Sequence, residues 1–170
     1  MTSVDLRRLG LRPGEERSEE HEVAIAPLDL GGQRYVVVPE RIRAQLTVTR
    51  TANGTVLQLR LTAELHGPCY RCLEDAALVQ PTDAREYQAE DPEGEEELES
   101  VYVADDRLDL SAWSRDAVVL ALPDKILCRV DCAGLCPVCG KNLNHEPHGH
   151  EGEETDPRWA ALAELKDSLG

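Results

Sequence analysis

Closely spaced pairs of cysteine and histidine residues are the feature that most strongly limits how this chain can fold. Eight such residues form four close pairs: Cys69 and Cys72, Cys128 and Cys132, Cys136 and Cys139, His148 and His150. A Cys-x-x-Cys turn directs two thiolates at one metal ion. Zinc suits a mixed set of sulfur and imidazole ligands best. The sequence therefore predicts a protein that binds zinc.

A disulfide framework is one alternative, because the cysteine count is even. However, residues 1–16 contain no apolar stretch that could serve as a signal peptide. No segment approaches the roughly 20 apolar residues of a membrane span. A redox dithiol at Cys136 and Cys139 is a second alternative, but no obvious βαβ unit surrounds the pair. We therefore expect reduced, metal-binding cysteines in a cytoplasmic protein that does not contact a membrane.

Two arrangements of the ligands remain open at this stage. One arrangement has two four-ligand sites, Cys69/Cys72/Cys128/Cys132 and Cys136/Cys139/His148/His150. The other has a single ribbon-like site, Cys69/Cys72/Cys136/Cys139, which leaves the remaining residues spare. The two histidines could also lie in a solvated, glycine-flanked loop without binding metal. We expect one or two structural zinc ions, each with four protein ligands.

The chain is strongly acidic, with a net charge of −15 over 170 residues. Its densest acidic run, Glu90–Glu99, predicts a solvated loop at residues 90–100. A field of this sign repels nucleic acid at long range and favours a basic protein as partner. The composition therefore argues against a protein that coats RNA without specificity.

A β-hairpin is the clearest predicted element. Residues 41–49 and 56–65 both alternate between apolar and polar side chains. Asn53-Gly54 between them is the favoured pair for a two-residue primed turn. This turn would set the pairs Ala52–Thr55, Val48–Leu59, Leu46–Leu61, Ala44–Ala63, Ile42–Leu65 and Arg43–Glu64. The pairs of apolar residues then all lie on one face, and Arg43 meets Glu64 on the other.

Further strands are predicted at residues 35–38 and 74–88. One helix is predicted from a Ser111 cap to Pro123, with Trp113, Ala117 and Leu120 on its apolar stripe. A last helix is predicted over residues 155–169. The expected fold class is α+β: an antiparallel β-sheet core with a long hairpin, two or three helices, and a zinc-stapled C-terminal region.

This reading divides the chain into three parts. Residues 1–20 form an N-terminal segment, and residues 21–123 form a β-rich domain with the acidic loop. Residues 124–170 form the metal-binding segment and the C-terminal helix, which we expect to pack on the same domain. The chain has no Phe, so the core must be aliphatic, and a bound metal would stabilise it.

The order of several motifs resembles the YceD family of large ribosomal RNA subunit accumulation proteins. The matching motifs are Cys69-x-Arg-Cys72-Leu73, Leu108-Asp-Leu110, Leu122-Pro123, the run from Cys128 to Asn144, and Asp156-Pro-Arg158. They cover roughly residues 20–170. Members of the family often carry Cys-x-Cys where this chain has His148-Gly-His150, which implies a ligand role for the histidines. Some members lack much of the second cluster, which implies a structural metal.

The resemblance implies a non-enzymatic ribosome-biogenesis factor that supports accumulation or processing of large-subunit (23S) ribosomal RNA. Its partner would be ribosomal RNA or a pre-ribosomal particle, contacted in part through a basic ribosomal protein. Arg41, Arg43 and Arg60 share one predicted sheet face and are the candidate contact residues. The alternative is a zinc-stabilised adaptor that binds a basic protein. Neither hypothesis includes a small-molecule substrate, and no hydrolase or phosphate-loop motif is present.

Overall fold

A computed structural model describes residues 2–90 and 99–150 of the chain. It divides into two compact units, Met1–Cys132 and Ala133–Gly170. The first unit holds all the strands and helices named below. The boundary between the units falls inside the predicted metal-binding segment, so each unit receives four of the eight candidate ligands.

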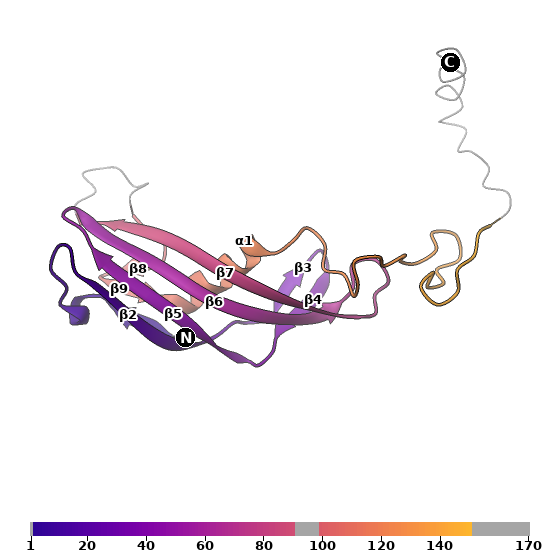
Figure 1. Cartoon of the computed structure of the whole chain (residues 1–170), viewed down its shortest axis with the longest axis horizontal. Coiled ribbons are helices and arrows are strands. Elements are labelled where there is room, and N and C mark those ends of the chain that lie inside the picture. The colour runs from indigo at the N-terminus through magenta and orange to yellow at the C-terminus, as the bar shows by residue number, and fades with distance from the viewer. Residues whose placement is uncertain (1, 91–98, 151–170) are drawn as a thin grey trace, which may run out of the picture. The chain divides into compact units, whose positions relative to one another are not determined.

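In its described residues, the first unit consists of two antiparallel sheets and one α-helix (Figure 1). The main sheet contains β2 (Glu16–Ala24), β3 (Leu28–Leu30), β4 (Gln33–Val37), β5 (Arg41–Arg50), β6 (Gly54–Pro68) and β7 (Asp75–Ala89). The small sheet contains β1 (Ser3–Asp5), β8 (Val103–Ala104) and β9 (Arg107–Asp109). A 3-10 turn, η1 (Arg7–Leu9), follows β1, and α1 (Leu110–Ala121) follows β9. The predicted strands at 35–38 and 74–88 correspond to β4 and β7.

Strand β6 is the centre of the main sheet. It pairs with β7 over all of its 15 residues. Its other edge is shared between β5, which pairs with residues 55–61, and β4, which pairs with Leu65 and His66. Five alternating side chains of β6 are buried: Leu57, Leu59, Leu61, Ala63 and Leu65. This face forms the aliphatic core that the composition predicts.

Helix α1 lies against one face of the sheet (Figure 1) and contacts β7, β2 and β6. It buries one side at helical spacing: Leu110, Trp113, Ser114, Ala117 and Val118. The predicted stripe is wrong at its last position, because Leu120 is 84% exposed. The predicted cap is also wrong, since the side chain of Asp109, not Ser111, accepts the hydrogen bond from the Ala112 N–H. The Ser111 hydroxyl instead accepts a bond from the N–H of Thr2.

The predicted fold class is wrong in its number of helices. In residues 2–90 and 99–150 the structure has one α-helix and the single turn η1, and strands dominate. The predicted helix at 155–169 lies outside the described residues, as does most of the acidic run. The boundary placed at residue 20 falls inside β2. This strand was not predicted from the sequence, because β2 carries charged residues on both faces and lacks the apolar alternation typical of a strand.

The predicted hairpin exists, but its register is wrong by two residues. Ala44 pairs with Leu61, Leu46 with Leu59, and Arg50 with Thr55. The chain turns over residues 51–54, and the N–H of Thr51 donates to the carbonyl of Gly54. A shift of two residues keeps every side chain on its original face, because the period of a strand is two. The predicted Arg43–Glu64 pair is therefore not formed.

Gly54 has a different role from the one its turn motif predicts. It is the first residue of β6, opposite Ala89 of β7. A Cβ atom here would lie 2.4 Å from the carbonyl oxygen of Gln88 and 2.6 Å from the hydroxyl oxygen of Tyr87. Glycine is required for this close approach of two strands, and a primed turn centred on residues 53 and 54 does not form.

We therefore expect Gly54→Ala to destabilise the first unit by about 1–3 kcal/mol, because the added methyl group overpacks against the backbone of β7. Asn53→Ala is the matched control, with a change within about 0.5 kcal/mol, since the Asn53 side chain is exposed and makes no hydrogen bond among the described residues. Urea unfolding of both variants measures this. Two equally large losses would instead support the primed turn.

Candidate metal centre

The eight candidate ligands come together in the two sets of the first arrangement. Cys69, Cys72, Cys128 and Cys132 form one group, and Cys136, Cys139, His148 and His150 form the other. Within each group the ligand atoms all lie within 4.8 Å of one another. All six cysteines are free. Each group lies within one of the two units, and this grouping is that of the two-site arrangement and not of the ribbon-like one.

The four-cysteine group has the dimensions of a tetrahedral site. The Sγ atoms of Cys69 and Cys132 are 3.8 Å apart, and those of Cys72 and Cys128 are 3.6 Å apart. Four sulfurs about 2.3 Å from a zinc ion would be about 3.8 Å from each other. The group is also enclosed, since Cys69, Cys72 and Cys132 are buried. Its donor set therefore fits one closed tetrahedral metal ion.

The end of the central strand positions this group. Cys69 follows the last residue of β6, and the chain returns to β7 through a tight turn. In the turn the N–H of Cys69 donates to the carbonyl of Glu74, and the N–H of Leu73 donates to the carbonyl of Cys69. Leu73 has a φ of 62°, the left-handed conformation that single residues adopt in turns. The rigid β6–β7 pairing thus fixes two of the four thiols.

The other two thiols come from the segment that follows α1. The N–H of Tyr70 donates to the carbonyl of Ile126 at 2.8 Å, which holds this segment against the turn. The Nη1 atom of Arg71 donates to the carbonyl of Cys132 at 2.7 Å. Sequence reasoning missed this role of Arg71, although the residue lies between the two cysteines of the first pair. Arg71 positions a ligand, and does not bind metal itself.

The thiols of the group differ in acidity. Burial opposes ionisation of Cys69, but the backbone amides of Cys72, Cys128 and Arg71 lower its pKa to about 6. Burial first, and then hydrogen bonds with the neighbouring thiols, raise the pKa of Cys72 to about 12. Burial also raises the pKa of Cys128. One thiol of the group therefore ionises readily, whereas the thiols of Cys72 and Cys128 resist ionisation. A divalent cation bound among them would favour their thiolate forms.

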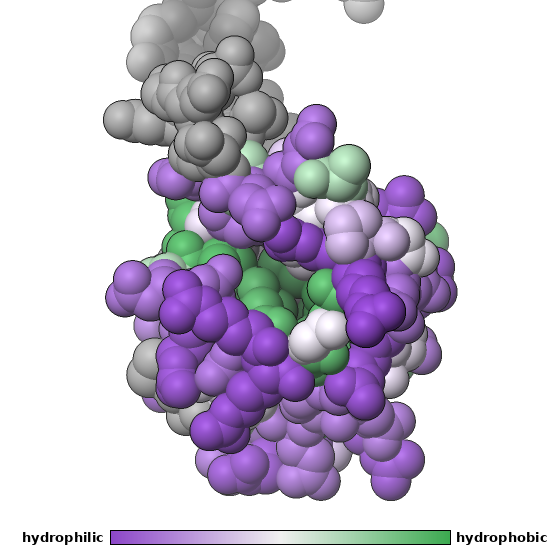
Figure 2. Space-filling view, turned by 90° about the vertical axis from the view of Figure 1, so that its left-hand side faces the viewer, coloured by the Kyte–Doolittle hydropathy of each residue, from purple (hydrophilic) through white to green (hydrophobic). Residues whose placement is uncertain are grey.

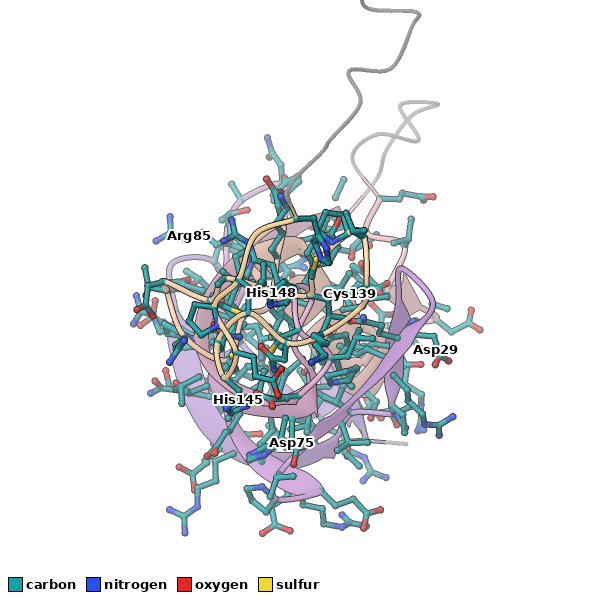
Figure 3. The ribbon with its side chains drawn as sticks, turned by 90° about the vertical axis from the view of Figure 1, so that its right-hand side faces the viewer. Asp29, Asp75, Arg85, Cys139, His145 and His148 are labelled. Atoms are coloured by element: carbon teal, nitrogen blue, oxygen red, sulfur yellow. The ribbon has the colours of Figure 1, made fainter. Side chains whose placement is uncertain are left out.

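The mixed group of the second unit brings two sulfurs close to two imidazoles. Nε2 of His150 is 3.2 Å from Sγ of Cys136, and Nε2 of His148 is 3.1 Å from Sγ of Cys139. Figure 3 shows Cys139 and His148 beside each other. Around a zinc ion these edges would measure about 3.5 Å, so the four atoms fit with a shift of a few tenths of an ångström. The histidines therefore have the geometry of ligands.

Local backbone contacts shape the mixed group. The N–H of Gly140 donates to the carbonyl of Cys136, and the N–H of Cys136 donates to the carbonyl of Lys141. Gly140 has a φ of 72°, a left-handed conformation that glycine adopts without strain. Backbone amides, that of Cys139 first, lower the pKa of Cys136 to about 6. A thiolate is therefore available near neutral pH.

A second contact orients one imidazole. Nδ1 of His148 is 2.7 Å from the carbonyl oxygen of Glu146. This hydrogen bond is the first cause of the raised pKa of His148. A proton held on Nδ1 leaves Nε2 free to bind a metal, as is usual for histidine ligands. The chain sequence held no signal for this carbonyl, because any residue can supply one.

The three predicted contact arginines lie together on the outer face of the main sheet. Arg41, Arg43 and Arg60 are exposed and line one shallow hollow, which also contains Glu20, Glu22 and Asp83. Nη1 of Arg43 lies 3.7 Å from Oε1 of Glu20, and Nε of Arg60 lies 2.9 Å from Oδ2 of Asp83. Hydrogen bonds from Gln58 and Arg60 lower the pKa of Asp83. The hollow holds as many carboxylates as guanidinium groups, so it is no basic patch.

A second hollow opens at one end of the first unit (Figure 2). Its floor is hydrophobic and its rim is hydrophilic, and Val48 is one of the residues that line it. Ion pairs occupy the charged rim: Arg7 lies 2.5 Å from Asp106, and Arg50 lies 2.6 Å from Glu90. These charged groups satisfy each other, and no set of metal ligands gathers there among the residues that the structure describes.

Comparison with known proteins agrees with the motif order. Residues 57–166 match the model of the family described as "Large ribosomal RNA subunit accumulation protein YceD". The chain belongs to the YceD family. The match includes all eight ligands of the two groups. No solved structure matches the chain significantly.

Two proteins with similar sequences come from mycobacteria. An uncharacterized protein of Mycobacterium tuberculosis is 36% identical over 168 residues, which cover 96% of this chain and 80% of that protein. An uncharacterized protein of Mycobacterium leprae is 33% identical over 169 residues, which cover 95% of this chain and 76% of that protein.

Within the described residues, no helix has the length and apolar character needed to cross a membrane.

We expect the two groups to bind metal independently. Cys69→Ser should lower the zinc content by about one ion per chain, and Cys136→Ser should do the same, because each group has its own four ligands. The first variant should lose hydrogen-exchange protection around residues 69–75 and 126–132, and the second only in residues 133–150.

Elemental analysis and hydrogen exchange of both variants measure these effects, and each variant is the control for the other. Loss of both metal ions from either variant would show a single shared site. Uniform loss of protection across β5 and β6 would show that the sheet depends on the metal.

Proposed function

We propose that this protein is a non-enzymatic ribosome-biogenesis factor that acts in the cytoplasm and supports the accumulation of large-subunit (23S) ribosomal RNA. Family membership carries this proposal, because the matching family is described by that role. The match extends over residues 57–166, which include most of β6, all of β7 and α1, and both ligand groups. The part of the chain that resembles the family is therefore the part that holds the candidate metal centres.

Zinc is the ion that the two groups suit best, and its role would be structural. Each group offers four sulfur or nitrogen ligands, the set that closed structural zinc sites use. A catalytic zinc keeps one position open for water or substrate. In the first unit, a zinc ion would connect the β6–β7 turn to the segment after α1. Zinc in the second unit would hold residues 136–150 together, where short loops bury few side chains.

A zinc-stabilised adaptor that binds a basic protein, such as a ribosomal protein, is the second candidate. Two observations favour it over direct contact with RNA. The net charge of −15 repels phosphate. The arginines that could have offset this charge locally are paired, Arg43 with Glu20 and Arg60 with Asp83. The adaptor is compatible with a role in ribosome assembly, since it describes how the protein reaches the particle.

The role in RNA accumulation is tested in cells that lack the protein. We expect the ratio of 23S to 16S ribosomal RNA to fall, and the wild-type chain to restore it. Cys69→Ser should restore it poorly, since the four-cysteine group holds the first unit together at one end. Gly149→Ala, which adds a methyl group in open space, is the matched control. An unchanged RNA ratio in the deletion strain would refute the proposed function.

Two sets of charge changes separate contact with RNA from contact with a basic protein. Glutamate at Arg41, Arg43 and Arg60 together should weaken binding to pre-ribosomal particles only if these residues touch phosphate. Each lost phosphate contact would then flatten the plot of log affinity against log salt by about one. Glutamine at positions 95–97 should slow association at low salt if the partner is basic.

We expect the glutamine changes to slow association at low salt and the arginine changes to have a small effect, because two of the three arginines already face carboxylates. Association rates measured by surface plasmon resonance at several salt concentrations decide between them. A large loss from the arginine variant, with an unchanged rate for the glutamine variant, would establish direct contact with RNA.

A further inference from the structure

Strand β2 leaves one side of its backbone unpaired. It is the last strand in the order of the main sheet, and among the residues that the structure describes it pairs only with β5 (Figure 1). Next to its first residue, the N–H of Arg50 donates to the carbonyl of Glu15. Residues in an antiparallel pair alternate between bonding to the partner and pointing away from it. The odd-numbered residues of β2 therefore bond to β5, and the even-numbered residues direct their N–H and C=O groups outward.

A hydrogen bond from another part of the chain supports this alternation. The hydroxyl of Thr2 donates to the carbonyl of Glu22 at 2.9 Å, so this even-numbered carbonyl does point outward. It is the one outward carbonyl of β2 with a partner in the described part of the chain. Within residues 2–90 and 99–150, the N–H and C=O groups of Glu16, Ser18 and Glu20 remain as a free edge. An edge of this kind can pair with an added strand.

The side chains of the same residues carry negative charge. Val23 is fully buried, so the odd-numbered side chains face the core and the even-numbered ones face outward. Glu16, Glu20 and Glu22 are exposed on that outer face. An added strand would run about 4.8 Å from β2 and about 10 Å from Arg41 and Arg43 on β5. The charges nearest to it would be the glutamates, although Glu20 also lies 3.7 Å from Arg43.

The opposite edge of the sheet does not share these properties. Strand β7 carries Pro81 in its middle, and a proline has no N–H group to offer an added strand. The outward side chains of β7 also mix both signs, with Asp83 and Arg85 near each other in sequence. Strand β2 contains neither proline nor glycine and only carboxylates and a serine at its outward positions from Glu16 to Glu22. It is therefore the edge that can select a partner by charge.

We propose that β2 binds an extended basic peptide segment of a protein partner as an additional β-strand. The segment carries Lys or Arg at every second position, so that these side chains face Glu16 and Glu20 while its backbone bonds to the free edge. This inference rests on the adaptor form of the proposed function and specifies its partner. RNA does not fit the edge, because the outer carboxylates repel phosphate and because peptide groups pair most regularly with another peptide backbone.

Binding of synthetic peptides to the full chain tests the proposal. The probe is a fluorescent nine-residue peptide that alternates Lys and Thr. One control peptide has the same composition with its lysines in a block, and another alternates but carries N-methyl groups on every second amide. We expect the alternating peptide to bind at least about tenfold more tightly than either control, because each control loses either the charge match or several backbone hydrogen bonds.

Variants of β2 locate the site. Ser18→Pro removes an outward N–H, which β5 does not use, and should weaken peptide binding about tenfold. Ser18→Ala is its matched control, since it loses the same side-chain contact with Thr47 but keeps the N–H. Glu16→Gln with Glu20→Gln should weaken binding about three- to tenfold. Glu40→Gln with Glu64→Gln removes equal charge from exposed positions outside β2 and should have little effect.

The outcomes separate this inference from the proposed function. Equal binding of the alternating and block peptides, or equal effects of the two glutamine pairs, would show a general acidic field and overturn the inference. If Ser18→Pro does not fold, the N-methylated peptide still tests the backbone contacts on the wild-type protein. A wild-type chain that restores 23S RNA but ignores all peptides refutes only the inference. Specific peptide binding without any effect on 23S RNA refutes only the proposed function.

Discussion

The uninterrupted pairing of β6 with β7 is the interaction on which the rest of the first unit depends. Fifteen residues of each strand face each other without a bulge, so the position of one end determines the position of the other. At the far end the two strands are joined by the turn that carries Cys69 and Cys72. Two thiols are thus held at a rigid point before any metal binds, and only the segment with Cys128 and Cys132 has to be ordered against them. A partly formed site of this kind lowers the entropy that metal binding must overcome.

The sequence predicted the hairpin and its faces, yet it could not determine their register. Side-chain alternation has a period of two, and a shift of two residues leaves the pattern unchanged. The turn motif was the only signal that could fix the shift, and it was misleading because Gly54 serves the close approach of β7. The predicted cross-strand pairs failed together for this one reason. Strand β2 was missed because its charged outer face and partly polar inner face hide the alternation.

The candidate metal centres were more predictable than the sheet register. Cysteine spacing along the chain limits which thiols can reach a common point, and the paired residues kept their pairing in the structure. What the sequence could not supply were the contacts that orient the ligands. The guanidinium of Arg71 on the Cys132 carbonyl and the Glu146 carbonyl on His148 depend on backbone positions. Backbone groups are present at every residue, so no pattern of side chains distinguishes these two.

The distribution of charge explains how an acidic protein could serve the assembly of an RNA particle. Several arginines of the first unit lie beside carboxylates from other strands or turns, as do Arg7, Arg43, Arg50 and Arg60. Such exposed pairs add little to stability, but they remove local positive potential that could attract phosphate. The chain keeps a net charge of −15, and the field of this charge extends about a Debye length into solvent. In the adaptor form of the proposed function, this field would attract lysine- and arginine-rich extensions of a partner protein. An acidic factor with a free strand edge would compete for these extensions with the RNA itself.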